Sequence, residues 1–311
     1  YTRLFDASLL AGKRVGIYEH SSAGRDLYAD MFQALGAEVV ALERSDEFVP
    51  IDTEAVSEAD KLKAKNWSEQ YDLDFIFSTD GDGDRPLVSD EKGNWLRGDV
   101  LGLICANAMD SEALAVPVSC NTAIEKSQAF EHVERTKVGS PYVIAQFEAL
   151  AAQYASVAGF EANGGFLLGS DAIVNKQTIK ALPTRDAVLP ALMLLAAAKD
   201  TTISALVDAL PKRVTHSDRI QNFATAKSLA ILTNAKQAPE IFMKTLGLAE
   251  NPIAQVDNTD GLRITLANDD VVHFRPSGNA PELRCYAESG SIEQAKHLVD
   301  HALKVVQQIE V

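Results

Sequence analysis

The residues best suited to chemistry lie in one aspartate-rich stretch, Ser78-Thr79-Asp80-Gly81-Asp82-Gly83-Asp84-Arg85. Carboxylates this close repel one another, so the cluster is costly without a counter-charge. A hard divalent cation supplies that charge, because Mg²⁺, Ca²⁺ and Mn²⁺ prefer oxygen ligands. The interspersed glycines allow a tight loop that turns the three side chains toward one point. The stretch therefore predicts a metal site at Asp80, Asp82 and Asp84.

Two other interpretations explain less of this stretch. A hairpin turn needs one Asp-Gly pair and leaves the other aspartates unexplained. A calcium EF-hand would match the alternating aspartates and also Glu91, but it needs glycine where Arg85 stands, followed here by Pro86. We therefore expect a metal loop of another kind.

The segments before the loop indicate an α/β domain over residues 1–110. Residues 14–42 predict a strand, an amphipathic helix and a second strand, which make a βαβ unit of a parallel sheet. Residues 73–77 are apolar and aromatic and predict a buried strand that ends at the loop. Open α/β sheets place their active sites at this end of their strands. An apolar helix over residues 99–109 is expected to close the domain.

A second, related α/β domain with a mixed sheet between helices is predicted over residues 111–213. Its strand at 156–160 leads into Glu161-Ala162-Asn163-Gly164-Gly165. A carboxylate and an amide on a glycine-bounded turn suit ligands with paired hydroxyl groups. Glycine-rich turns are, however, mostly structural.

A C-terminal α+β domain, an antiparallel sheet with helices, is predicted over residues 214–311. Two of its strands flank the loop Arg275-Pro276-Ser277-Gly278-Asn279-Ala280-Pro281-Glu282. Arginine, a hydroxyl and backbone N–H groups in one loop suit a phosphate. A surface turn with Arg275 paired to a nearby acid explains the same residues equally well.

The composition of the chain argues against some classes of binding partner and indicates a compartment. The chain has 311 residues, is 46% apolar and carries a formal net charge of -15, which argues against nucleic acid and anionic membranes as partners. Three cysteines without paired spacing indicate a reducing compartment, and we expect the cytoplasm. No membrane-spanning run or signal peptide is visible in the sequence.

The order of the three loops resembles the α-D-phosphohexomutase superfamily, which includes phosphomannomutase and phosphoglucomutase. The resemblance covers the whole chain, and its specific parts are the Asp-Gly-Asp-Gly-Asp-Arg and Arg-Pro-Ser-Gly runs. It implies that Asp80, Asp82 and Asp84 bind Mg²⁺ and that Arg85 is catalytic, bordering the reacting phosphate. The substrate-binding residues expected for a hexose phosphate are Lys137, Gly139, Glu161, Asn163, Gly164, Arg275, Ser277, Gly278, Asn279 and Arg284.

The sequence departs from the family pattern at three positions. Family sugar loops often read Glu-x-Ser-Gly-His, whereas Asn163 and Gly165 replace the serine and histidine here. Asn279 stands where a threonine commonly follows the phosphate-loop glycine. These changes leave open the choice among mannose, glucose and glucosamine phosphates.

The activity implied is intramolecular phosphotransfer between the 6- and 1-positions of a hexose phosphate. A phosphoserine donates the phosphoryl group, and hexose 1,6-bisphosphate serves as intermediate and activator. Members of the family have four domains, and this chain resembles the second to the fourth. We expect the phosphoserine domain to be missing, to dock at the cleft in the complete enzyme, and to leave this chain alone inactive. The alternative is a non-catalytic protein that binds sugar phosphates.

Overall fold

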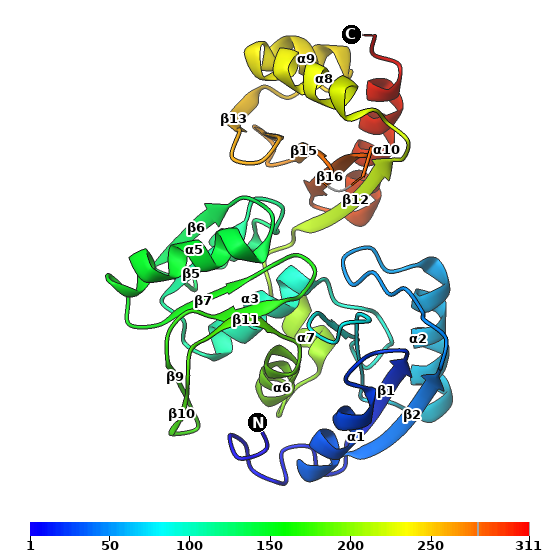
Figure 1. Cartoon of the computed structure of the whole chain (residues 1–311), viewed down its shortest axis with the longest axis vertical. Coiled ribbons are helices and arrows are strands. Elements are labelled where there is room, and N and C mark those ends of the chain that lie inside the picture. Colours follow the sequence, from blue (N-terminus) through cyan, green and yellow to red (C-terminus); the bar gives the residue numbers. More distant parts are fainter. Residues whose placement is uncertain (279, 311) are drawn as a thin grey trace. The chain divides into compact units, whose positions relative to one another are not determined.

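The computed structural model in Figure 1 describes residues 1–278 and 280–310. The chain forms two compact units. The N-terminal unit comprises Tyr1–Cys120, Ile124–Arg135 and Gly139–Pro211, and the C-terminal unit comprises Asn121–Ala123, Thr136–Val138 and the residues from Lys212 onward. Within the described part of the chain, no helix is long and apolar enough to cross a membrane.

The first sheet of the N-terminal unit is mixed, with the strand order β2-β1-β3-β4. Strand β1 runs parallel to β2 and β3, which confirms the predicted βαβ unit, and β4 is antiparallel to β3. The elements of this part are β1 (Arg14–His20), α1 (Arg25–Ala34), β2 (Glu38–Arg44), α2 (Glu58–Tyr71), β3 (Phe75–Thr79) and β4 (Pro86–Val88).

Helices cover both faces of strand β3, which delivers the aspartate loop. Phe75 and Phe77 pack on Phe32 of α1, whereas Ile76 joins a cluster with Trp67 of α2. Successive side chains of a strand point to opposite faces, so the two helices lie on opposite sides of the sheet. A central strand covered in this way reads as a continuous apolar run, as predicted for residues 73–77.

The second sheet of the N-terminal unit has the order β11-β8-β7-β5-β6. Strand β7 is parallel to β5 and antiparallel to β8, so this sheet is also mixed. Its strands are β5 (Ala113–Pro117), β6 (His132–Thr136), β7 (Val157–Phe160), β8 (Phe166–Leu168) and β11 (Leu182–Asp186), and a separate hairpin joins β9 (Ala172–Val174) to β10 (Gln177–Ile179). Its helices are α3 (Gly98–Ala108), α4 (Ala123–Lys126), α5 (Ser140–Ala151), α6 (Val188–Ala197) and α7 (Ile203–Asp208).

Helix α3 belongs to this second sheet, which differs from the expectation that it closes the first domain. It packs on β7 and α6, and the ring of Phe160 in β7 lies directly against Gly102 of α3. The neighbouring residue Gly159 faces Val143 of α5, so α3 and α5 cover opposite faces. The first two predicted domains form one compact unit, and we propose that their boundary lies before α3.

The C-terminal unit contains a five-stranded antiparallel sheet, order β12-β16-β15-β14-β13, as predicted. Its elements are β12 (Val214–Ile220), α8 (Thr225–Gln237), α9 (Pro239–Thr245), β13 (Ile253–Asp257), β14 (Leu262–Leu266), β15 (Val271–Pro276), β16 (Leu283–Ser289) and α10 (Ile292–Gln307). Phe274 and Cys285 point into the core beneath the helices. Their neighbours Arg275 and Arg284 therefore lie on the other face of the sheet.

Candidate functional site

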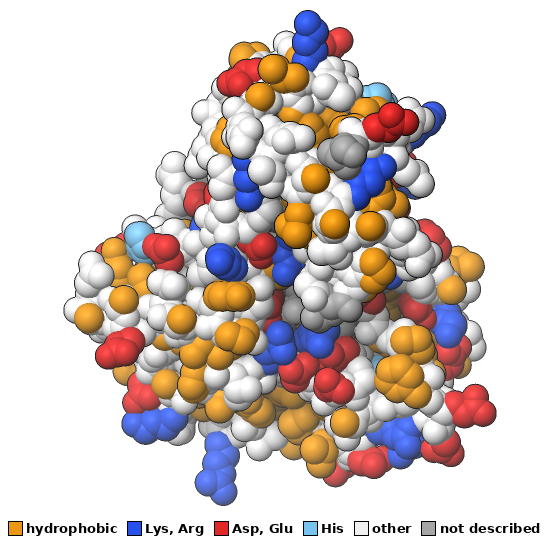
Figure 2. All heavy atoms as spheres, turned by 45° about the horizontal axis from the view of Figure 1, so that its top comes forward, with side chains coloured by type: hydrophobic (Ala, Val, Ile, Leu, Met, Phe, Trp, Pro, Cys, Tyr) orange, Lys and Arg blue, Asp and Glu red, His pale blue; other side chains and the backbone are white. Residues whose placement is uncertain are grey.

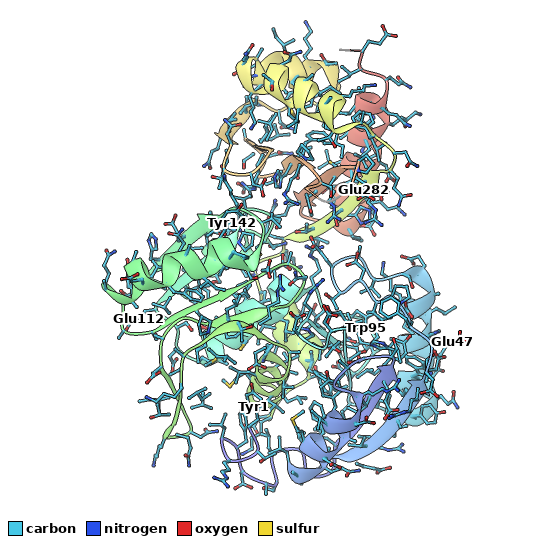
Figure 3. The ribbon with its side chains drawn as sticks, viewed as in Figure 1. Tyr1, Glu47, Trp95, Glu112, Tyr142 and Glu282 are labelled. Atoms are coloured by element: carbon cyan, nitrogen blue, oxygen red, sulfur yellow. The ribbon has the colours of Figure 1, made fainter. Side chains whose placement is uncertain are left out.

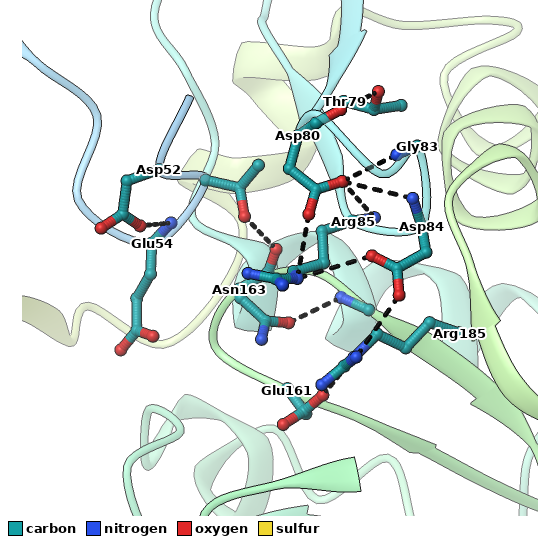
Figure 4. Close-up of polar contacts among 12 residues, drawn as sticks. Asp52, Glu54, Thr79, Asp80, Gly83, Asp84, Arg85, Glu161, Asn163 and Arg185 are labelled. Atoms are coloured by element: carbon teal, nitrogen blue, oxygen red, sulfur yellow. Dashed lines mark hydrogen bonds and ion pairs between the residues drawn. The ribbon is translucent and has the colours of Figure 1, made fainter. Parts of the chain in front are cut away.

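The aspartate loop follows β3 directly and is organised by its first carboxylate. Asp80 Oδ1 accepts hydrogen bonds from the backbone N–H groups of Gly83, Asp84 and Arg85 at 3.1, 3.2 and 3.2 Å. Gly83 has φ of +81°, a conformation that favours glycine because it has no Cβ. The predicted tight turn is therefore present (Figure 4).

Arg85 turns back over this loop and lies between two of its carboxylates. Its Nε is 3.1 Å from Asp80 Oδ2 and 3.5 Å from Asp84 Oδ1. Asp80 is only 6% exposed. Burial raises the pKa of Asp80, and this effect outweighs the Arg85 charge and the backbone hydrogen bonds that lower it. The loop thus holds a desolvated carboxylate that benefits from nearby positive charge.

The three aspartates do not converge into a preformed metal cluster. Within residues 1–278 and 280–310 no three His, Cys, Asp or Glu side chains are arranged to hold a metal ion. Asp82 is exposed, and Asp84 Oδ1 is buried without a hydrogen-bond partner. The donors are all oxygens, and Asp84 Oδ1 is buried without a hydrogen bond, with Arg85 Nε 3.5 Å away. This set fits a hard divalent cation, which would give that oxygen a direct partner. The metal assignment is therefore compatible with the site and stays a proposal.

Buried polar side chains next to the end of β3 hold the start of the aspartate loop. Ser22 Oγ is 2.7 Å from Thr79 Oγ1, and His20 Nε2 is 2.9 Å from the carbonyl oxygen of Thr79. Burial lowers the pKa of His20, so the ring is neutral, and the carbonyl acceptor indicates that Nε2 carries its proton. This layer fixes the end of β3.

The predicted sugar loop follows β7 and is held by its own amide. Asn163 Oδ1 accepts a hydrogen bond from the Gly165 N–H at 3.0 Å, so this oxygen organises the turn. Thr53, which the sequence did not single out, donates to the carbonyl oxygen of Asn163 at 2.7 Å. Glu161 is buried, with 3% of its surface exposed. A carboxylate this buried needs a charged partner.

That partner is Arg185 in β11, which also reaches the aspartate loop. Its Nε donates to Glu161 Oε2 at 2.7 Å, and its Nη1 donates to Asp84 Oδ2 at 3.3 Å. Arg185 was not predicted as a site residue, because the residues around it form no recognisable motif. The aspartate loop and the predicted sugar loop thus meet through one side chain in the N-terminal unit (Figure 4).

Close backbone packing also holds the sugar loop in place. Gly164 has φ of +93°, and a Cβ there would lie 2.9 Å from the carbonyl oxygen of Pro86, which follows Arg85. A Cβ on Gly98, the first residue of α3, would lie 2.0 Å from the Gly164 nitrogen. Glycine at these positions lets α3 and the two loops approach one another.

We expect Gly98→Ala to destabilise the N-terminal unit, because the added methyl group meets rigid backbone. Overpacking of this kind costs about 1–3 kcal/mol. Urea denaturation followed by tryptophan fluorescence measures the loss. Gly290→Ala, in the C-terminal unit, is the control for a glycine-to-alanine change without a close contact, since the nearest atom to its new Cβ is 4.0 Å away. Equal midpoints for the parent and Gly98→Ala would contradict this close packing.

The predicted phosphate loop joins β15 to β16 in the C-terminal unit. Arg275 and Arg284 are directly opposite each other in this strand pair. Like charges in that position are destabilising, and an anionic ligand would offset the repulsion. The Arg275 Nε is 2.9 Å from Asp260 Oδ2. The ion pair expected from the alternative, a surface turn with Arg275 paired to an acid, is therefore present.

The other residues of this loop are placed as follows. The Ser277 N–H donates to the carbonyl oxygen of Glu282 at 2.9 Å and closes the loop. Glu282, labelled in Figure 3, is 3.8 Å from Arg284 Nη2 and 3.7 Å from Arg219 Nε. A Cβ on Gly278 would meet open space, and Asn279 lies outside the described residues. The phosphate-binding role of the loop stays a proposal.

Lys137 and Gly139 lie on the segment between β6 and α5. Lys137 is exposed, and Gly139 has φ of +128° and occupies the N-cap position of α5. Their predicted contact with substrate stays a proposal. The N-terminus of helix α6 is held by Asp186, whose Oδ1 accepts hydrogen bonds from the Val188 and Leu189 N–H groups at 2.9 and 3.0 Å.

Comparison with known proteins assigns the family. Residues 97–214 match the phosphoglucomutase/phosphomannomutase α/β/α domain III, and residues 220–305 match the phosphoglucomutase/phosphomannomutase C-terminal domain. The chain belongs to the α-D-phosphohexomutase superfamily. The matched regions include the sugar loop and the phosphate loop, and this confirms the resemblance inferred from the motifs.

Two curated phosphomannomutases are similar over nearly the whole chain. That of Salmonella muenchen is 58% identical over 97% of this chain, and that of Sinorhizobium fredii is 42% identical over 98%. The chain spans 63% and 65% of the lengths of these two proteins.

Solved structures of the superfamily share the fold. A putative phosphomannomutase from Thermus thermophilus has a TM-score of 0.70 and 19% identity, with 97% of this chain and 62% of that chain covered. An Aspergillus fumigatus N-acetylphosphoglucosamine mutase, solved with GlcNAc-6P and magnesium, has a TM-score of 0.60 and 15% identity, with 98% and 69% covered.

Proposed function

We propose that this chain forms the cation-, sugar- and phosphate-binding part of a hexose-phosphate mutase, with mannose or glucose phosphate as the substrate. The observation that carries the proposal is the contact through Arg185, which brings Asp84 of the aspartate loop beside Glu161 of the sugar loop. A mutase needs a phosphoryl-transfer centre next to a group that recognises sugar hydroxyls. The similarity to two phosphomannomutases supports the same activity.

The proposed roles follow from the position of each side chain. Asp80, Asp82 and Asp84 would hold a Mg²⁺ ion, which supplies charge neutralisation for the phosphoryl group in transit. Arg85 places a second positive charge at the same point. Glu161 and the Asn163 amide recognise sugar hydroxyls, and Gly164 and Gly139 allow the backbone turns of their loops. Lys137 is the further proposed substrate-binding residue, and it belongs to the C-terminal unit. In the C-terminal unit, Arg275, Ser277, Gly278, Asn279 and Arg284 are the proposed residues for binding a phosphate group.

The phosphoryl donor in this proposal is a phosphoserine outside residues 1–311, on a domain that docks beside the aspartate loop. It transfers its phosphoryl group to the free hydroxyl of a hexose monophosphate and gives hexose 1,6-bisphosphate. The bisphosphate turns over and returns its other phosphoryl group to the serine. The serines near the loop are engaged otherwise: Ser22 Oγ bonds Thr79, and Ser21 Oγ accepts the Val49 N–H at 2.8 Å.

The cytoplasm is the proposed compartment. Cys105, Cys120 and Cys285 are free and buried, and burial raises the pKa of each thiol, which keeps them unreactive. The face shown in Figure 2 carries acidic and basic side chains interspersed with apolar ones. The net charge of -15 argues against a nucleic acid as a partner and is compatible with a small anionic substrate that binds a few arginine or lysine side chains.

Phosphorus NMR of the complete gene product tests this function. Incubation with mannose 6-phosphate, Mg²⁺ and a trace of glucose 1,6-bisphosphate is expected to give a mannose 1-phosphate signal at the expense of the substrate. Glucose 6-phosphate and glucosamine 6-phosphate in parallel reactions identify the preferred sugar. Binding of these sugar phosphates without isomerisation of any of them would instead establish a non-catalytic binding protein.

A further inference from the structure

Arg185 joins two carboxylates that come from two different loops. Its Nε–Glu161 contact of 2.7 Å and its Nη1–Asp84 contact of 3.3 Å use different edges of one planar guanidinium. The Arg185 side chain is 24% exposed and that of Glu161 4%, so the pair with Glu161 is largely shielded from solvent. A shielded, charge-assisted pair fixes side-chain orientation more firmly than an exposed one.

The contact to Arg185 uses the Oδ2 atom of Asp84. Asp84 Oδ2 bonds Arg185, whereas Oδ1 is buried, lacks a hydrogen-bond partner among the described residues and lies 3.5 Å from Arg85 Nε. Metal-binding carboxylates are commonly held by a second group in this way, which aims the remaining oxygen at the ion. Arg185 is therefore placed to orient Asp84 toward a cation.

The backbone of the sugar loop makes room for Arg185. A Cβ on Gly165 would lie 2.6 Å from Arg185 Cδ and 2.9 Å from its Cγ. Any side chain at position 165 would thus displace the stem of Arg185. Gly165, which stands where family members often have histidine, therefore leaves the space through which Arg185 reaches Asp84.

We propose that Arg185 is a positioning residue that couples cation binding at Asp84 to sugar binding at Glu161. The proposal rests on the proposed function, because it assigns the cation to the aspartate loop and the sugar to Glu161. A cation bound to Asp84 orders that carboxylate and, through the Arg185 guanidinium, also orders Glu161. A sugar bound to Glu161 orders Asp84 in the same way. The second ligand then meets an already ordered side chain and binds more tightly.

Arginine is required for this role because of its shape. A guanidinium bonds two carboxylates at once through its rigid fork of donors, whereas a lysine ammonium is a point charge on a flexible stem. Lysine at position 185 therefore keeps the charge and loses the simultaneous contact. Comparison of Arg185→Lys with the parent therefore separates the effect of the positive charge from the effect of the simultaneous contact to two carboxylates.

Calorimetric titration of this chain measures the coupling. Mg²⁺ is titrated with and without saturating mannose 6-phosphate, and the ratio of the two dissociation constants is the coupling factor. We expect a factor of at least about 5 in the parent, since coupling between sites commonly amounts to 5–150-fold. By reciprocity, Mg²⁺ must tighten mannose 6-phosphate binding by the same factor. Mg²⁺ also pairs directly with the sugar phosphate in solution, but this pairing is the same for every variant. Differences in the coupling factor between variants therefore come from the protein.

Three variants and one control separate positioning from a merely structural role. Arg185→Ala is expected to weaken Mg²⁺ binding about 10–100-fold, as loss of a group that orients a metal ligand does, and to bring the coupling factor to about 1. Arg185→Lys retains part of the Mg²⁺ affinity but loses the coupling. Gly165→Ala keeps every charge and displaces Arg185, so it also loses the coupling.

The control is Arg44→Ala, which removes an arginine that likewise joins two carboxylates, Glu19 at 3.4 Å and Asp26 at 2.5 Å. It is expected to keep the parental coupling factor. Circular dichroism verifies that each variant is folded, and Gly165→Ala and Arg185→Lys carry the test if Arg185→Ala does not fold.

The outcomes are distinct. Parental coupling in folded Arg185→Lys and Gly165→Ala, with the parent binding both ligands, would overturn the role of Arg185 and leave the proposed function intact. A parent chain that binds neither Mg²⁺ nor mannose 6-phosphate would overturn both. Loss of coupling in the three variants but not in Arg44→Ala supports the inference.

Discussion

Asp82→Asn is expected to weaken Mg²⁺ binding to this chain by at least about 100-fold, because it removes a charged ligand from the ion. The Asp82 side chain is exposed and makes no hydrogen bond or ion pair to another described residue, unlike Asp80, whose Oδ1 accepts from three backbone N–H groups. The substitution also lowers the repulsion among the three aspartates. The fold should therefore persist while the cation is lost, and turnover of the complete enzyme should be abolished.

Calorimetric titration with Mg²⁺ measures this loss, with a thermal melt of the metal-free protein alongside. Asp30→Asn is the matched control, since it removes the charge of an exposed aspartate on α1. We expect Asp30→Asn to bind Mg²⁺ as the parent does. An unchanged dissociation constant in Asp82→Asn would exclude Asp82 as a ligand and, with it, the metal loop as predicted.

Arg275→Ala is expected to weaken binding of mannose 6-phosphate about 10–100-fold. A hydrogen bond to a charged group contributes about 1.5–3 kcal/mol, and Arg275 stands opposite Arg284 where an anion would meet both. In the complete enzyme the same substitution raises the Michaelis constant. Mannose without its phosphate should bind the variant and the parent equally weakly, because it offers no anion to Arg275.

The pair with Asp260 gives a second possible role for Arg275, and the same experiment separates the two. An arginine that only stabilises the fold would lower the melting temperature of Arg275→Ala and leave the affinity for mannose 6-phosphate unchanged. Arg14→Ala is the control, because Arg14 also lies on a strand and its Nε bonds one acid, Glu38, at 3.1 Å. It should keep the parental affinity for mannose 6-phosphate.

The strands and loops that carry the site were predictable because their signals are local. The apolar run before Asp80 predicted β3, and the strand-like segments 271–274 and 283–286 predicted the pair that carries the phosphate-like loop. The order of the loop motifs then pointed to the family. Each of these signals lies within a few consecutive residues.

The partners of the site side chains could not be predicted, because they depend on distant segments. Arg185 is 101 residues from Asp84 in the sequence, and the return of β11 to the sheet brings them together. The pairing of Arg275 with Asp260 likewise depends on neighbouring strands. Helix α3 was assigned to the preceding domain because its apolar sequence says that it is buried but not which sheet buries it.

The central claim is that one site in the N-terminal unit holds a divalent cation beside a sugar. Proton NMR of mannose 6-phosphate with this chain and a trace of Mn²⁺ tests it most directly, because paramagnetic broadening falls steeply with distance. We predict strong broadening of the sugar protons with the parent and none beyond free Mn²⁺ with Asp82→Asn. Sugar that binds the parent without broadening, under conditions where Mn²⁺ is bound, would contradict the claim.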